Sequence, residues 1–181
     1  MKRLKTPQLI LRDWAEEDAK DLHRYAKDPE AGPAAGWKPH ENMEESREVA
    51  KMFIREGNVW ALEEKASGRV IGSLGLHKDK KRPGVPGVKR VGYILAKEFW
   101  GQERMTEAVK EAFLPEAAFF DHLPGTVVPR KMINRQHSES FFLKGVPHGS
   151  LRESFVRFDG TLMDEVCYSL TVEEWKEGRG C

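Results

Sequence analysis

The chain has 181 residues, of which 39% are apolar and 33% charged, and its formal net charge is +1 at pH 7. This length fits one domain with a sizeable core, and the apolar content is too high for a wholly disordered chain. The balanced charge gives no reason to expect nucleic acid as a partner. No run approaches the roughly 18 apolar residues of a membrane span, so we expect no membrane partner either.

The two cysteines, Cys167 and Cys181, are too few for a disulfide framework. Cys167 lies in an apolar run and is expected to be a small buried residue, whereas Cys181 is terminal and expected to be free. No Cys-x-x-Cys or His-rich spacing indicates a metal. Residues 1–7 are basic but lead into no long apolar stretch, so we expect no signal peptide. A cytoplasmic location is the resulting prediction.

The first half of the chain alternates between strand and helix patterns, read from hydrophobic periodicity and from Gly and Pro punctuation. Its predicted elements are a strand over 8–14 (QLILRDW), a helix over 15–27, a loop over 32–40, a helix over 43–57 that stops at glycine, and two strands over 58–64 and 69–77 joined by a hairpin turn at Ser67-Gly68.

The second half continues with weaker patterns. Its predicted elements are a basic loop over 79–87, a strand over 88–96, a helix from Gly101 to about Phe113 ended by Pro115, a short strand over 126–128, a helix over 134–144 ended by Gly145, and a hairpin of 150–158 with 164–170 around Asp159-Gly160. The basic cluster 78–82 is expected to be solvated. Antiparallel strands interrupted by helices predict an α+β fold with a mixed, mostly antiparallel sheet flanked by helices.

The strand that ends at Ala96 leads into a glycine-containing loop and the start of a helix. The first amides of a helix have no partner inside it and lie at the positive end of its dipole. Such a helix start can bind an anion such as a pyrophosphate. Taken alone, the pattern fits an ordinary strand–loop–helix connection at least as well.

Residues 92–108 (GYILAKEFWGQERMTEA) resemble the GNAT superfamily of N-acetyltransferases, and more narrowly the RimJ/RimL-like branch that acetylates ribosomal-protein N-termini. The opening LILRDW with Asp18, the run VIGSLGL, the spacing from Asn134 to Gly145, and Asp159-Gly160 with DEVCYSL are also similar to family patterns. The likeness covers nearly the whole chain and is weakest over 114–146. It implies a single GNAT-like domain over residues 1–181, acetyl-CoA as cosubstrate, no metal, and acetyl transfer to a primary amine.

The resemblance implies a cofactor-binding role for the end of the strand and for the loop and helix start that follow. The implied residues are Ile94, Leu95, Ala96, Trp100, Gly101, Gln102, Glu103, Arg104, Met105, Thr106 and Asn134. Glu103 stands where the family has its first loop glycine, and it adds a negative charge where phosphates would approach. Alternatively, Glu103 is a favourable acidic residue of the first helical turn that points into water, or is neutralised by Arg104 or a nearby lysine.

In the family the acceptor amine attacks the acetyl thioester directly, and backbone amides at Ile94 and Leu95 would polarise the carbonyl. The resemblance implies that Asn134 contacts the pantetheine arm and that His137 or Ser138 donates a proton to the leaving thiolate. A polar helix surface is the alternative for these two. Glu107 is a candidate base by proximity, although a helical glutamate usually faces solvent.

Gly36-Trp37 and the two early helices would form the acceptor side of the cleft, with Trp37 contacting the substrate; simple packing of Trp37 is equally open. The implied partners are acetyl-CoA and an amine acceptor, either a protein N-terminus or a small amine, and the oligomeric state, homodimer included, is open. The alternative function is a catalytically silent binding or interaction module. It is favoured by Glu103, by Arg90 in place of a family carboxylate, and by Phe141 in place of a family tyrosine.

Overall fold

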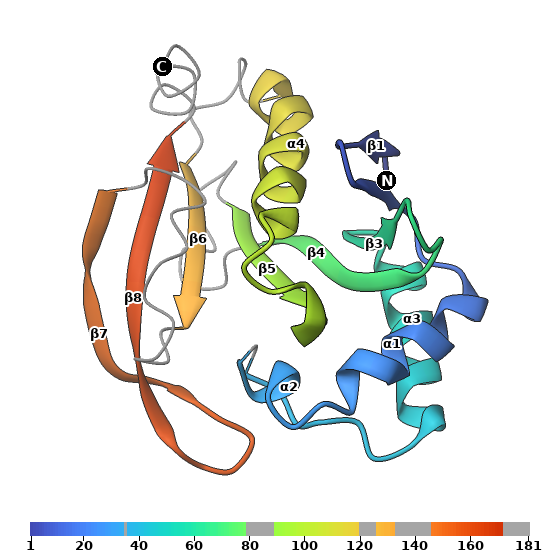
Figure 1. Ribbon diagram of the computed structural model, residues 1–181. Helices are drawn as coiled ribbons and strands as arrows, with labels where there is room; N and C mark the ends of the chain where they lie inside the picture. The colour runs from blue at the N-terminus through green and yellow to red at the C-terminus, as the bar shows by residue number, and fades with distance from the viewer. Residues whose placement is uncertain (35, 79–88, 120–125, 133–145, 172–181) are drawn as a thin grey trace. The chain divides into compact units, whose positions relative to one another are not determined.

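The computed structural model describes residues 1–34, 36–78, 89–119, 126–132 and 146–171 (Figure 1). The helices are η1 (Glu16–Asp18), α1 (Ala19–Ala26), α2 (Ala31–Ala34), α3 (Met43–Glu56), η2 (Lys97–Phe99) and α4 (Arg104–Phe119), η denoting a 3-10 helix. The strands are β1 (Leu4–Lys5), β2 (Leu9–Arg12), β3 (Val59–Glu64), β4 (Val70–Lys78), β5 (Lys89–Leu95), β6 (Thr126–Met132), β7 (Val146–Val156) and β8 (Leu162–Thr171).

The chain forms two compact units, residues 1–75 with 93–111 and residues 76–92 with 112–181, and strands β4 and β5 each run through both. In the first unit the strand order is β1-β2-β3-β4-β5. Strands β1 to β4 are antiparallel neighbours, with Leu9 opposite Glu64 and Val59 opposite Gly75. The predicted hairpin turn is confirmed between β3 and β4, where the Glu64 amide donates to the Arg69 carbonyl at 2.8 Å.

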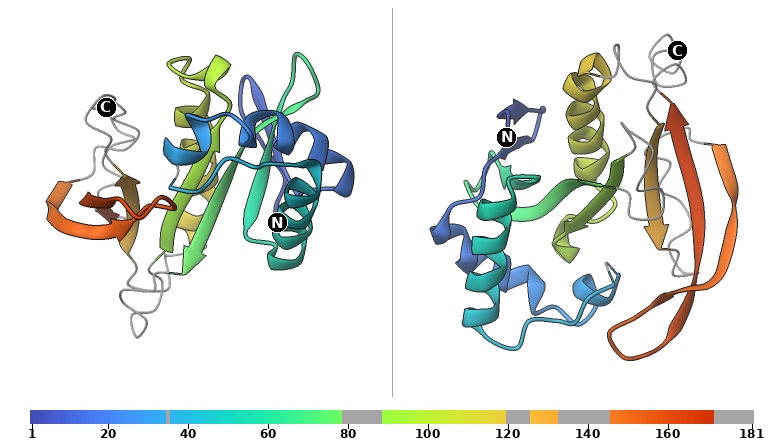
Figure 2. Two further views of the ribbon diagram at one scale, coloured as in Figure 1. Left: turned by 90° about the horizontal axis from the view of Figure 1, so that it is seen from below. Right: turned by 180° about the vertical axis from the view of Figure 1, so that it is seen from behind.

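Helices α1 and α3 pack side by side and bury one face of the sheet in the first unit (Figures 1 and 2). Their small and apolar residues meet alternate residues of the strands, as the pleat requires. The fully or nearly fully buried members of this core include Leu22, Ala26, Ala50, Val59, Ala61, Val70 and Ile94. Helix α4 has a buried stripe of its own, formed at helical spacing by Met105, Ala108, Val109 and Ala112.

Helix α3 has the ends that its sequence predicts. The Asn42 side chain accepts a hydrogen bond from the Glu45 amide at 2.9 Å and so satisfies one of the unpaired amides of the first turn. Gly57 ends the helix with φ at 60°, and its amide donates to the Phe53 carbonyl. The helix–glycine stop predicted for residues 43–57 is therefore confirmed.

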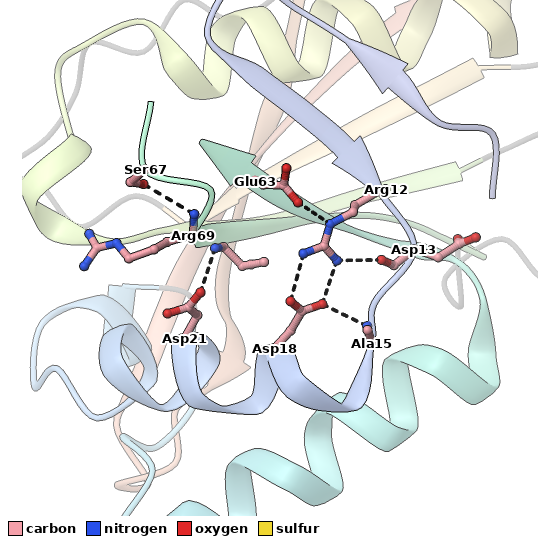
Figure 3. Close-up of polar contacts among 9 residues, drawn as sticks. Arg12, Asp13, Ala15, Asp18, Asp21, Glu63, Ser67 and Arg69 are labelled. Carbon is pink, nitrogen blue, oxygen red and sulfur yellow. Dashed lines mark hydrogen bonds and ion pairs between the residues drawn. The ribbon is translucent and has the colours of Figure 1, made fainter. Parts of the chain in front are cut away.

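An arginine ion pair joins strand β2 to the 3-10 helix η1, directly before α1 (Figure 3). Arg12 donates to both carboxylate oxygens of Asp18, at 2.7 and 2.8 Å, and also to Glu63. Asp18 is only 5% exposed and additionally accepts from the Ala15 amide. The Asp18 hydrogen bonds, outweighing burial, raise the pKa of Arg12 above its usual range. The spacing of Arg12 and Asp18 in the sequence therefore has a structural cause, a buried bidentate ion pair.

The second unit contains a parallel pair and a long hairpin. Strand β5 pairs with β6 in parallel, Arg90 lying opposite Val128, and β8 lies between β6 and β7 with antiparallel pairing on both sides. The predicted hairpin is confirmed, with longer strands, and Figure 2 shows β7 and β8 as one long curved ribbon. Its turn contains Gly160 at φ 81°. The prediction of a mixed, mostly antiparallel sheet flanked by helices is confirmed.

Several predicted boundaries were wrong. Helix α4 begins at Arg104 rather than Gly101 and continues to Phe119 through Pro115. Strand β1 carries no periodic pattern that could have indicated it, nor does the short helix α2, which overlaps the start of the predicted loop 32–40. Strand β6 is longer than the predicted 126–128. The predicted loop 79–87, the helix 134–144 and Cys181 lie outside the described residues.

Candidate cofactor site

Strand β5 ends in close contact with β4. The Ala96 amide donates to the Ile71 carbonyl at 2.8 Å, and a Cβ on Gly72 would lie 2.4 Å from the Ile94 carbonyl oxygen. The Leu95 carbonyl accepts from the indole Nε1 of Trp100, also at 2.8 Å. The strand end is thus fixed on one side by its neighbour and on the other by the loop that follows it.

The predicted cofactor residues Ile94, Leu95 and Ala96 are the last buried positions before that loop. Because the Ala96 amide already donates to the Ile71 carbonyl, it is not free to donate to a ligand. The role predicted for the amides of Ile94 and Leu95 stays a prediction.

The loop contains two residues in the left-handed backbone region before α4 begins. Gly101 has φ at 70° and Glu103 has φ at 58°, and both residues are exposed, as is Gln102 between them. The Glu103 carbonyl accepts from the Glu107 amide at 3.0 Å, so Glu103 caps the helix. The prediction that Glu103 belongs to the first helical turn was therefore wrong; it precedes that turn, in a conformation that glycine adopts freely and other residues seldom adopt.

Arg104 does not neutralise Glu103, contrary to one expectation. Its Nη1 donates to Glu64 Oε1 at 2.8 Å, and its guanidinium carbon lies 4.7 Å from the centroid of the Phe99 ring. The Arg104 and Glu64 side chains are only 14% and 9% exposed. Met105, the next residue, is buried, so its side chain belongs to the core and only its backbone is a candidate for a cofactor contact.

Glu107 is engaged in hydrogen bonds within the fold. Its Oε1 accepts from the Thr6 hydroxyl at 2.6 Å and from the Gln8 amide at 3.1 Å. These bonds tie α4 to the turn between β1 and β2. The carboxylate has a structural function that the sequence did not reveal, because its partners lie about a hundred residues away.

Trp37 packs near helices α1 and α3. It is half-buried against the core that these helices form, and its ring centroid is 5.0 Å from that of His40. His40 Nδ1 lies 2.8 Å from the hydroxyl of Ser46, and His23 Nδ1 lies 3.0 Å from the same hydroxyl. Packing against this core thus explains why the Trp37 side chain is half-buried, and its predicted contact with substrate stays a prediction.

Ser46 is fully buried between these two histidines, and this trio was not foreseen as a unit. The one available signal was His23, which falls on the apolar stripe of α1. Of the other predicted or discussed residues, Arg90 lies in the part of β5 that belongs to the second unit. Asn134, His137, Ser138 and Phe141 lie outside the described residues.

Within the described residues, no three His, Cys, Asp or Glu side chains gather as metal ligands would, and no helix has the length and apolar character needed to cross a membrane. The described residues bring together the end of a strand, a loop with two left-handed residues, and the start of a helix. Their backbone amides form the kind of arrangement that receives an anionic cofactor.

Residues 8–134, which include this arrangement, match the acetyltransferase (GNAT) domain family. The chain belongs to the GNAT family of N-acetyltransferases, whose members use acetyl-CoA.

Relatives along the whole chain agree. A protein of Bacillus licheniformis described as the uncharacterized N-acetyltransferase p20 is 26% identical over 97% of this chain and 99% of its own length. The crystal structure of a GNAT-family acetyltransferase from Bacillus anthracis superposes with a TM-score of 0.80 at 13% identity, covering 95% of this chain and 99% of that one. RimL, a ribosomal L7/L12 alpha-N-protein acetyltransferase solved in complex with coenzyme A, gives 0.72 at 16% identity over 96% and 99%.

Proposed function

We propose that this chain transfers the acetyl group of acetyl-CoA to a primary amine, and that the segment from Trp100 to Thr106 receives the pyrophosphate. The observation that supports this most is the helix start at Arg104, preceded by two exposed left-handed residues, in a chain of the GNAT family. Amides at a helix start attract phosphate because they lack partners within the helix and lie at its positive end.

In this proposal a neutral amine attacks the acetyl carbonyl carbon, a C–N bond forms and the C–S bond breaks. Amides of Ile94 and Leu95 donate to the carbonyl oxygen as it gains charge. The amine loses a proton to solvent or to a base, and the leaving thiolate gains one from His137 or Ser138. Asn134 contacts the pantetheine arm. The binding site holds amine and thioester together, which supplies much of the remaining rate.

The acceptor is proposed to be a protein N-terminus or a small amine that reaches the acetyl group past Trp37. Support for a protein N-terminus comes from RimL, which shares the fold and acts on a ribosomal protein. A cytoplasmic location, the single domain over residues 1–181 and the homodimer stay predictions.

Acetyl-CoA is expected to stabilise the folded chain. A ligand that binds only the native state raises the free energy of unfolding by about 2.7 kcal/mol at 100 times its dissociation constant. Thermal unfolding with acetyl-CoA, and with S-acetylpantetheine as the matched ligand without pyrophosphate, measures this. We expect a clear rise with acetyl-CoA and a much smaller one with the truncated ligand; no rise at millimolar acetyl-CoA would exclude the proposal.

The second candidate function, a silent binding module, has one observation in its favour: the exposed carboxylate of Glu103 beside the proposed phosphate site. Incubation with acetyl-CoA, a set of N-terminal peptides and a set of small amines separates the two. Thiol release with an acetylated product indicates the enzyme, whereas binding without any product indicates the module.

A further inference from the structure

The first residue of helix α4 is held by a buried ion pair that reaches across the fold. Arg104 donates to Glu64, the last residue of β3, and the second carboxylate oxygen of Glu64 accepts from the Ser67 hydroxyl at 2.7 Å. The Arg104 guanidinium also lies over the Phe99 ring. One side chain thereby connects the helix start to the β3–β4 hairpin and to helix η2.

We infer that Arg104 and Glu64 are a positioning pair for the cofactor loop, an inference that rests on the proposed function. An arginine at the start of a proposed phosphate site would ordinarily be assigned as a phosphate ligand. Here the Arg104 side chain is only 14% exposed and its Nη1 is paired with Glu64, and withdrawing it would leave a buried carboxylate without its countercharge. The arginine therefore acts on the cofactor through the backbone of the loop.

The backbone next to Arg104 shows what has to be held in place. Glu103 is in the left-handed region, which residues other than glycine keep only where the surrounding structure enforces it. On one side of it, Gln102 Nε2 donates to the Glu98 carbonyl at 2.7 Å from an exposed position. On the other side, the ion pair of Arg104 with Glu64 is buried and so shielded from solvent and salt.

The Glu103 carbonyl, in turn, accepts from the amide of Glu107, whose own carboxylate is bound to Thr6 and Gln8. The helix start is therefore fixed at two points, Arg104 by strand β3 and Glu107 by the β1–β2 turn, rather than by contacts to a ligand. The buried pair is the only one of these contacts that joins two opposite charges, so it is the one whose loss should move the loop most.

The decisive experiment compares Glu64→Gln with Arg104→Gln by calorimetric titration of acetyl-CoA. If Arg104 positions the loop, both variants weaken binding by about tenfold, the scale of one lost hydrogen bond to a charged group. If Arg104 is a phosphate ligand restrained by Glu64, Arg104→Gln weakens binding while Glu64→Gln frees the guanidinium and tightens it. Unchanged or tighter binding by Glu64→Gln overturns the inference.

Two controls isolate the pair. Glu48→Gln makes the same chemical change in an ion pair with Lys51, whose side chains are 63% and 52% exposed, and is expected to leave binding unchanged. The double variant Glu64→Gln with Arg104→Gln replaces the pair by two neutral amides, and recovery of part of the lost affinity supports positioning. S-acetylpantetheine, which has no pyrophosphate, is expected to bind all variants alike.

A measurement on the free protein keeps the inference separate from the proposed function. Hydrogen exchange at the amides of residues 107–110, the first in α4 with partners inside the helix, is expected to be about tenfold faster in Glu64→Gln than in the parent chain, because the helix start opens more readily. If the parent chain does not bind acetyl-CoA, the proposed function fails while the exchange rates still decide whether the pair holds the loop. Equal exchange rates in both proteins overturn the positioning role.

Discussion

Two places beside the proposed cofactor site call for glycine, for different reasons, and only one of them has it. In β4, Gly72 has an ordinary backbone conformation, but a Cβ there would meet the Ile94 carbonyl oxygen at 2.4 Å and the Leu95 Cα at 3.2 Å. In the loop, Glu103 has φ at 58° and its side chain is exposed. Space forbids a side chain at the first place, whereas the second merely disfavours one through the backbone.

The difference shows which glycines of a sequence pattern can be replaced while the backbone keeps its conformation. A backbone carbonyl in a sheet can move aside only by displacing its strand, so a side chain at Gly72 is costly. A left-handed residue in an open loop costs about 1–2 kcal/mol, which surrounding contacts can offset. The missing loop glycine at position 103 is therefore compatible with a loop of the usual shape, and the predictions below test each half of this comparison.

The largest effect is expected for Gly72→Ala. The added methyl group must displace the end of β5, and such overpacking costs about 3 kcal/mol of unfolding free energy. Urea unfolding measures this. The matched control is Gly68→Ala in the β3–β4 turn, where φ is 68° and nothing lies within 4 Å, so only backbone strain of about 1 kcal/mol is expected. Equal losses in the two variants would show that space at Gly72 is not limiting.

The sequence predicted what depends on neighbouring residues. Gly57 ends α3, and Gly68 and Gly160 mark the two confirmed hairpins, because helix-stop and turn chemistry act over a few positions. The strand–loop–helix order of the cofactor site was predicted for the same reason. It also carried a strong family resemblance, which the match of residues 8–134 confirms.

What the sequence did not predict depends on residues far apart in the chain. Nothing near Arg104 indicates that its partner is Glu64, and nothing near Glu107 indicates Thr6. The left-handed conformation of Glu103 was missed because an acidic residue before a helix ordinarily signals a first turn. Helix α4 passes Pro115, so the rule that proline ends a helix failed at this position.

Ser46 is a third kind of position, where hydrogen bonding, rather than space or backbone conformation, determines which residue fits. When both rings are neutral, the hydroxyl donates to Nδ1 of one histidine and accepts from Nδ1–H of the other. Burial lowers the pKa of His40 below its ordinary 6.5, with His23 acting in the same direction and Glu45 opposing both. The unfolded chain then binds more protons than the folded one, so stability falls as the pH drops below about 6.5.

His40→Asn is expected to remove this part of the pH dependence, because asparagine keeps an amide donor near the position of Nδ1 but does not titrate. Urea unfolding at several values between pH 5 and pH 8 measures it. Ser46→Ala is the companion variant: it takes the partner from both rings and should lower stability at every pH by about 2 kcal/mol. An unchanged pH slope in His40→Asn would assign the acid sensitivity to other groups.

The smallest effects are expected at Glu103, where three substitutions separate charge from backbone strain. Glu103→Gln keeps the left-handed strain and removes the charge, so acetyl-CoA should bind about threefold more tightly, a small gain because the carboxylate is exposed and screened by salt. Its stability should not change.

Glu103→Gly removes both the strain and the charge. Relief of about 1–2 kcal/mol of strain is partly cancelled by the extra freedom of glycine in the unfolded chain, about 0.4–1 kcal/mol, which leaves a net stabilisation of roughly 0.5 kcal/mol. Glu103→Asn should behave like Glu103→Gly to a lesser extent, because asparagine tolerates the left-handed region.

Calorimetric titration of acetyl-CoA and urea unfolding of all three variants separate the effect of charge from that of backbone strain. Should Glu103→Gly bind acetyl-CoA more weakly than Glu103→Gln, the stiffness of a non-glycine residue at this position supports the loop, and the missing glycine is then an adaptation of this chain rather than a defect in its cofactor site.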